Sequence, residues 1–88
     1  MLEIKRKTSF KKEIKKIKDP KVLSELKEII STLIDGKPLD AKYKPHPLHG
    51  EYKSYMDCHV KHDVVLVYKI DGKYLWLYKI GSHSDIFG

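Results

Sequence analysis

The chain has 88 residues, which is enough for one domain and leaves no room for a second. Its 41% apolar content, including one Trp and six Tyr, can form a core, so a disordered tail protein is excluded. The single cysteine, Cys58, cannot form a disulfide within the chain. No apolar run approaches the roughly 18 residues of a membrane span or resembles a signal peptide. We therefore expect one soluble domain over residues 1–88 that functions in the cytoplasm, away from membranes.

The net charge of +6 is concentrated in the first third of the sequence. Residues 1–27 hold ten basic and four acidic side chains, whereas residues 28–88 hold eight of each. This excess fits either a solvated helix surface or a site that attracts nucleic acid or an acidic protein. All cations except Arg6 are Lys, which attracts phosphate but lacks the bidentate geometry with which Arg reads bases. Sequence-specific binding of duplex DNA is therefore disfavoured.

The first half of the chain predicts one strand and two helices. Residues 2–6 alternate apolar and polar side chains, as a short strand with one inward face does. From Thr8 onward, apolar residues recur at helical spacing among lysines. Asp19-Pro20 then predicts the start of a second helix, because Asp can cap free amides and Pro is tolerated at the first helical position. The apolar stripe of this second helix ends at Gly36, and the two helices form a hairpin.

The second half predicts a loop followed by three strands. The loop over residues 37–50 contains three prolines and has no periodicity. From Tyr52 the period becomes two, and the predicted strands cover residues 52–61, 64–70 and 73–80.

Asp71-Gly72 is a strong signal for a two-residue hairpin turn between the last two strands. If Ile70 pairs with Lys73, then Val67 faces Trp76 and Leu66 faces Leu77, and we expect Trp76 to be buried. The order β-α-α-β-β-β predicts an α+β sandwich, in which the helix hairpin covers one face of a four-stranded sheet. This sheet consists of the N-terminal strand and a three-stranded antiparallel meander, and its other face is partly open.

The histidines are separated from the lysine excess, because all five lie from residue 46 onward: His46, His49, His59, His62 and His83. Histidine both donates and accepts protons near pH 7, so several of them over one sheet face would suit general acid-base catalysis. Taken singly, each also fits an ordinary surface residue. On the predicted strand, His59 shares a face with Asp57, and Asp63 begins the next strand. We expect these groups to meet at the edge and ends of the sheet.

A metal site is an alternative, because His46-x-x-His49 and Cys58-His59-x-x-His62 offer nitrogen and sulfur ligands. The spacing fits no zinc knuckle, and on a strand Cys58 and His59 point to opposite faces. The sequence has no Gly-rich phosphate loop and no Ser-centred elbow, so nucleotide hydrolysis and acyl transfer lack their usual signatures. Phosphodiester chemistry on RNA is the leading candidate.

Three stretches carry a resemblance to a known family: Tyr43-Lys44-Pro45-His46-Pro47-Leu48-His49-Gly50, then Tyr52-Lys53-Ser54-Tyr55-Met56-Asp57-Cys58-His59-Val60, and finally Gly81-Ser82-His83-Ser84-Asp85-Ile86-Phe87-Gly88. With these, the chain resembles the YafQ branch of the RelE-type toxins, in the RelE/ParE superfamily. These toxins are ribosome-dependent mRNA endonucleases of type II toxin-antitoxin modules. The resemblance covers essentially the whole chain and is specific in its second half.

The resemblance implies a metal-independent endoribonuclease without a cofactor, whose functional positions fall on His46, His59, Asp63 and His83, with Asp57 and Phe87 beside them. The 2′-hydroxyl of the mRNA would attack the adjacent phosphate and leave a 2′,3′-cyclic phosphate and a 5′-hydroxyl. His46 and His83 are the candidate acid-base pair, in either order. Asp63 would orient a histidine or act as the base, and His59 would transfer a proton or bind phosphate.

Substrate contacts are expected from cations and aromatic side chains. Lys53, Lys61 and Lys79 are candidates for phosphate contacts, and Phe87 or Tyr55 for stacking on a base. The sequence departs from the family pattern at Met56, where a basic residue is usual, and at Lys79, where an Arg is common. Neither departure removes a proton-transfer group.

The resemblance also implies partners: mRNA on the ribosome, and a cognate antitoxin that wraps the toxin. The toxin alone would be a monomer, and it would form a hetero-oligomer with the antitoxin, with the basic helix hairpin as a dock for an acidic amphipathic segment. Two other classes stay open. One is a noncatalytic ParE-like inhibitor of gyrase, which would not need the histidine set. The other is a basic RNA-binding module without cleavage.

Overall fold

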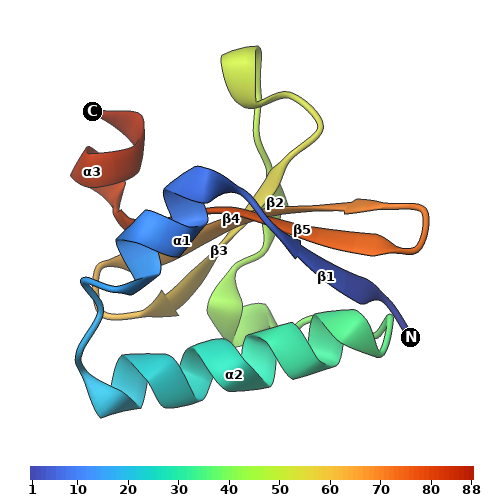
Figure 1. Cartoon of the computed structure of the whole chain (residues 1–88), viewed down its shortest axis with the longest axis horizontal. Coiled ribbons are helices and arrows are strands. Elements are labelled where there is room, and N and C mark those ends of the chain that lie inside the picture. Colours follow the sequence, from blue (N-terminus) through green and yellow to red (C-terminus); the bar gives the residue numbers. More distant parts are fainter.

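The structure is a computed structural model that describes all 88 residues and contains three α-helices and one five-stranded sheet (Figure 1). The elements in chain order are β1 (Glu3–Arg6), α1 (Thr8–Ile14), α2 (Pro20–Ile34), β2 (His46–Pro47), β3 (Met56–Lys61), β4 (Val64–Asp71), β5 (Tyr74–Ser82) and α3 (His83–Phe87), with 3-10 turns at Ala41–Tyr43 and Gly50–Tyr52. The strand order is β1-β5-β4-β3-β2. β1 is parallel to β5 and the other neighbours are antiparallel. The predicted α+β class is confirmed.

Helix α2 begins and packs as its sequence predicts. The carboxylate of Asp19 accepts a hydrogen bond of 2.9 Å from the amide of Lys21, and Pro20 is the first helical residue. The helix buries one stripe, made of Val22, Leu26, Ile29 and Leu33. At 15 residues, α2 is the longest helix, and no helix is long and apolar enough to cross a membrane.

The two faces of the sheet have different cores. Helices α1 and α2 cover one face, where they pack on Cys58, Val60, Leu66, Tyr68, Leu75, Leu77 and Ile80 in the main core. On the other face, Val65 and Val67 form a smaller core with Ile86 of α3. Figure 1 shows α2 on one side of the sheet, and α3 with the turn Gly50–Tyr52 on the other. The face that we expected to be partly open is therefore covered by α3 over part of its area.

Two local predictions were wrong, and one helix was missed. The predicted loop over residues 37–50 contains the two-residue strand β2. The strand that we expected from Tyr52 begins at Met56, because the residues before it form a 3-10 turn and Ser54 has a φ of 80°. Helix α3 was not predicted at all. Its N-terminus is capped by Ser82, whose hydroxyl accepts a 3.1 Å hydrogen bond from the amide of Asp85.

The predicted register of the last hairpin was also wrong. Asp71 pairs with Tyr74, so the loop residues are Gly72, at a φ of 59°, and Lys73. Further along, Tyr68 faces Leu77 whereas Val67 faces Lys79, so Tyr78 is an extra residue in β5 and forms a β-bulge.

These differences change the environment of several side chains. Val67 faces Lys79 rather than Trp76, and Leu66 faces Ile80 rather than Leu77. Trp76, which we expected to be buried, is half-buried and belongs to neither core. Lys7 Nζ lies 4.7 Å from the centre of its ring, and such a contact at an exposed site contributes only about 0.5–1 kcal/mol.

The core assignment predicts unequal effects of two truncations on stability. Ile29→Ala removes a fully buried side chain from the contact between α2 and the sheet, so it should cost about 2–5 kcal/mol and lower Tm by about 10 °C or more. Trp76→Ala should have a clearly smaller effect, because the ring lies outside both cores. Thermal melts of both variants test this, and an equal or larger loss for Trp76→Ala would contradict the placement.

Candidate active site

A row of side chains crosses four strands on the face of the sheet opposite α1 and α2. His46 of β2 pairs with Asp57 of β3, Asp57 pairs with Val67 of β4, and Val67 pairs with Lys79 of β5. Residues opposite each other on neighbouring strands lie about 5 Å apart, so the row spans roughly 15 Å. Strand β2 consists of His46 and Pro47 only, and its pairing with β3 places the imidazole of His46 beside the carboxylate of Asp57.

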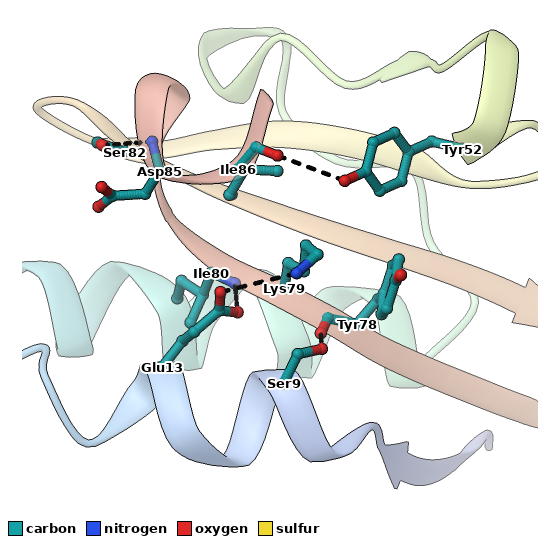
Figure 2. A network of polar contacts seen from close by, with 9 residues as sticks. All are labelled: Ser9, Glu13, Tyr52, Tyr78, Lys79, Ile80, Ser82, Asp85 and Ile86. Carbon is teal, nitrogen blue, oxygen red and sulfur yellow. Dashed lines mark hydrogen bonds and ion pairs between the residues drawn. The ribbon is translucent and has the colours of Figure 1, made fainter. Parts of the chain in front are cut away.

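Helix α3 brings His83 to this face, next to His59. Ile86 packs on Val65 and Val67, and the carbonyl of Ile86 accepts a hydrogen bond of 3.3 Å from the hydroxyl of Tyr52 (Figure 2). These contacts fold the helix back over the sheet. As a result, the ring centres of His83 and His59 lie 5.5 Å apart, and that of Phe87 lies 5.4 Å from His83.

Asp57 lies beneath these histidines and is buried, with 1% of its surface exposed. Nε2 of His46 lies 2.7 Å from Oδ1 of Asp57, which is an ion-pair distance, while half of the histidine side chain stays exposed. The contact does not have hydrogen-bond geometry, and neither carboxylate oxygen of Asp57 has a hydrogen-bond partner. Burial raises the pKa of Asp57, and the neighbouring His46, His59 and His83 act in the opposite direction. A buried carboxylate that lacks a hydrogen bond and has three histidines nearby is typical of a functional site.

The three predicted phosphate-binding lysines lie at different distances from the histidines. Lys79 lies near the row, with Nζ 3.9 Å from a carboxylate oxygen of Glu13. Lys53 is exposed beside the turn Gly50–Tyr52. Lys61 lies on the opposite side, in a hollow with Glu25 of α2, so the structure does not bring it to the histidines.

Asp63 is exposed in the turn between β3 and β4, and no hydrogen bond or ion pair joins it to a histidine. It lines a hollow with Ser82 and Asp85, which flank His83 in the sequence. His62 also lies outside the cluster, with Nε2 4.0 Å from a carboxylate oxygen of Asp19. The structure therefore gathers His46, Asp57, His59, His83 and Phe87, and it leaves Asp63 at one side.

Cys58 cannot share a metal with His59. The thiol lies in the main core, where burial raises its pKa to about 12, whereas His59 faces the other side of the sheet. No group of three or more His, Cys, Asp or Glu side chains is arranged to hold a metal ion.

Next to the site the sequence reasoning named Tyr55 but missed Tyr52, Tyr78 and Lys69. Tyr78 lies 4.9 Å from Tyr55 and 6.0 Å from Tyr52 between ring centres, and Nζ of Lys69 lies 5.1 Å from the centre of the Tyr55 ring. The period of two along the strand could have placed Lys69 on the face of Val65 and Val67. Alternation with the buried Leu75 and Leu77 could likewise have placed Tyr78 on this face, whereas Lys79 reaches the same face only because of the bulge.

Helix α1 supports the bulged part of β5. Strand β1 ends at Arg6, opposite Leu77, so the outer edge of β5 has no strand partner beyond that point. There the hydroxyl of Ser9 donates a 2.7 Å hydrogen bond to the carbonyl of Tyr78, and the carboxylate of Glu13 accepts one of 3.1 Å from the amide of Ile80 (Figure 2). Two side chains of α1 thus replace the missing strand contacts.

The family model described as the bacterial toxin of type II toxin-antitoxin system, YafQ, matches residues 2–88. The chain belongs to the YafQ toxin family. It is 42% identical over 69 residues to the mRNA interferase toxin YafQ of Escherichia coli strain K12, covering 77% of this chain and 75% of that protein.

Solved structures agree with this membership. A crystal structure of a copper-bound mutant toxin from Helicobacter pylori superposes with a TM-score of 0.87 at 40% identity, covering 99% of this chain and all of the other. The YafQ chain in the Escherichia coli DinJ-YafQ complex superposes with a TM-score of 0.85 at 35% identity, and the match covers both chains completely. The predicted resemblance to YafQ toxins is confirmed.

The buried carboxylate predicts a pH-dependent effect of one substitution in this YafQ-family chain. The pKa of Asp57 is higher in the folded than in the unfolded protein, so its stabilising contribution is complete at low pH and is lost as the pH rises through the folded-state pKa. Asp57→Asn removes the buried charge and should raise Tm at pH 8 by about 4 °C or more. The gain should shrink as the pH falls towards 4.

Thermal melts from pH 4 to pH 8 measure this difference. Asp63→Asn is the matched control, because its carboxylate is exposed, and it should leave Tm nearly unchanged across the series. A lower Tm for Asp57→Asn than for the wild type at pH 8 would show that the charge is stabilised by its histidine neighbours.

Proposed function

We propose that this YafQ-family toxin is an endoribonuclease that cuts translated mRNA on the ribosome and so inhibits protein synthesis. The observation that supports this most is the gathering of His46, His59 and His83 around the buried Asp57 on one face of the sheet. Relatives at about 40% identity are named mRNA interferase toxins. Three histidines around a carboxylate provide proton donors and acceptors near neutral pH, which RNA cleavage needs.

In the proposed reaction the 2′-hydroxyl of one nucleotide attacks the adjacent phosphorus. The bond from phosphorus to the 5′-oxygen of the next nucleotide breaks, and the products are a 2′,3′-cyclic phosphate and a 5′-hydroxyl. One proton leaves the 2′-hydroxyl and one is added to the 5′-oxygen, so an acceptor and a donor are required. His46 and His83 carry these two transfers, in either order.

The remaining residues support this chemistry. Asp57 holds the ring of His46, which is the orienting role that we expected of Asp63. Asp63 is the alternative acceptor of the 2′-hydroxyl proton, in place of one of the two histidines. His59, beside His83, donates to the phosphate or transfers a proton, and the half-exposed Phe87 stacks on a base. Lys53, Lys61 and Lys79 supply positive charge towards phosphates, with Lys61 serving the more distant RNA or ribosome.

A cognate antitoxin is the proposed protein partner, and the toxin alone is a monomer. A solved YafQ relative is described as part of a DinJ-YafQ toxin-antitoxin complex. In this chain an apolar groove lies between β1, α1 and α2, lined by residues such as Ile4, Phe10 and Leu23, with Arg6 and Lys27 also lining it. An acidic amphipathic segment of the antitoxin matches both the apolar lining and the basic charge of this groove.

Loss of one histidine should separate catalysis from stability. His83→Ala should lower the single-turnover rate of mRNA cleavage on programmed ribosomes by about 100-fold or more, because a positioned proton-transfer group contributes about 10²–10⁴-fold. Tm should change little, since the side chain is exposed at the start of α3. His62→Ala is the matched control, because His62 is exposed and lies outside the cluster, and it should cleave at the wild-type rate.

Mapping the 5′ ends of a translated mRNA after induction of the wild-type chain identifies the class of activity. New 5′ ends within codons are expected. Intact transcripts together with inhibited gyrase would favour the ParE-like alternative, and RNA binding without new ends would favour the binding module.

Removal of metal should leave cleavage intact, because the proposed steps use side-chain protons. The purified protein is treated with EDTA, exchanged into chelator-free buffer and then added to ribosomes in magnesium, so that the ribosomes stay assembled. The single-turnover rate should equal that of untreated protein. Loss of activity that stoichiometric zinc or copper restores would overturn metal independence.

A further inference from the structure

The bulge in β5 places two successive residues on the same face of the sheet. Leu77 and Ile80 both lie in the main core. Two residues therefore separate these core residues, whereas a regular strand has one residue between neighbouring core residues. These two residues, Tyr78 and Lys79, both oppose Val67 and both face away from the main core. Nζ of Lys79 lies 5.3 Å from the centre of the Tyr78 ring. A regular strand would have turned one of these two side chains towards the helices.

A second pair of a tyrosine and a lysine, Tyr55 and Lys69, lies next to Tyr78 and Lys79. The rings of Tyr55 and Tyr78 are 4.9 Å apart and inclined by 36°, and Nζ of Lys69 lies 5.1 Å from the centre of the Tyr55 ring. Both tyrosines are half-buried and rest on the small core of Val65 and Val67, so they are held in place while part of their surface stays accessible. Lys79 forms an ion pair with Glu13, whereas Lys69 forms no ion pair with a carboxylate.

This patch is continuous with the histidine cluster. Tyr52 lies 6.0 Å from Tyr78 and 5.6 Å from Phe87, and Phe87 lies 5.4 Å from His83, measured between ring centres. Across the strands, Lys79 is separated from Asp57 only by Val67. A nucleotide over the tyrosines would therefore belong to the same RNA strand as the phosphate at the histidines.

We propose that Tyr55, Tyr78, Lys69 and Lys79 form a subsite for single-stranded RNA, in which a base next to the cleaved bond stacks on the tyrosines and the lysines bind the flanking phosphates. The subsite rests on the proposed ribonuclease function and extends its substrate contacts from Phe87 and Lys79 to Tyr55, Tyr78 and Lys69. Aromatic rings with adjacent cations are the usual surface for unpaired nucleotides, because every base has a stacking face and every nucleotide a phosphate. Ser9 and Glu13 of α1 maintain the bulge, and with it the position of Tyr78 (Figure 2).

The first test measures binding of a short single-stranded RNA to the isolated toxin, with all variants made in the His83→Ala background so that the RNA is not cut. Tyr78→Leu keeps apolar volume over Val67 but loses the ring, and it should bind about ten-fold more weakly than Tyr78→Phe, within the range measured for one stacked base. Tyr74→Leu is the matched control on the same strand. Like Tyr78, Tyr74 has lysine ammonium groups over its ring, those of Lys5 and Lys73, but it lies at the hairpin turn, away from the proposed subsite. Tyr74→Leu should therefore leave the affinity for RNA unchanged.

The second test uses the lysines, which can be changed without altering the core. Lys69→Gln should weaken RNA binding and reduce the slope of log affinity against log salt by about one, as expected for one lost phosphate contact. Lys73→Gln is its control, because Nζ of Lys73 also lies over a tyrosine ring, 5.4 Å from the centre of Tyr74. If a thermal melt shows that Tyr78→Leu is not folded, the comparison of the RNA affinities of Lys69→Gln and Lys73→Gln tests the subsite by itself.

Equal affinities of Tyr78→Leu and Tyr78→Phe, or of Lys69→Gln and Lys73→Gln, would overturn the subsite. This failure is distinguishable from failure of the proposed function, because binding is measured without cleavage. A toxin that cuts mRNA but shows equal affinities has no such subsite. A toxin that loses binding in Tyr78→Leu yet never cuts mRNA keeps the subsite and loses the enzymatic function.

Discussion

The burial of the Asp57 carboxylate is the constraint on which the functional face depends. A carboxylate with 1% of its surface exposed and no hydrogen bond is unfavourable unless positive charge lies nearby. His46, His59 and His83, from three separate segments, offset only part of the effect of burial, which still raises the pKa of Asp57. The burial of Asp57 and the position of His46 are therefore coupled, since Nε2 of His46 lies 2.7 Å from the carboxylate.

One face of the sheet carries the main core, and the opposite face carries the candidate active site. Helices α1 and α2 bury the main core against one side, and most of the stabilising apolar contact lies there. The opposite side keeps only a small core beneath Ile86, which is enough to anchor α3 and to place His83 near His59. A change on the functional face can therefore alter the site without opening the main core.

Helix α1 connects the two faces through the edge of β5. Phe10 lies in the main core, while Ser9 and Glu13 bind the backbone of the bulged segment. The bulge turns Tyr78 and Lys79 together towards the functional face, so a helix of the stable side fixes the position of side chains on the other side. The pair of hydrogen bonds explains how a strand can remain ordered after its neighbour β1 has ended.

The sequence by itself determined the features that depend on local pattern. Apolar spacing and the Asp19-Pro20 cap were sufficient for α2, and alternation placed Cys58 and His59 on opposite faces of β3. The family resemblance pointed to His46, Asp57, His59 and His83, which the structure brings together. Tertiary structure alone decided the hairpin register, the bulge at Tyr78, the pairing of the short β2 with β3 and the return of α3 over the sheet. These features arise from contacts between residues far apart in the chain, such as Ser9 with Tyr78 and Ile86 with Val65, and no periodicity within one segment reports a contact made by another.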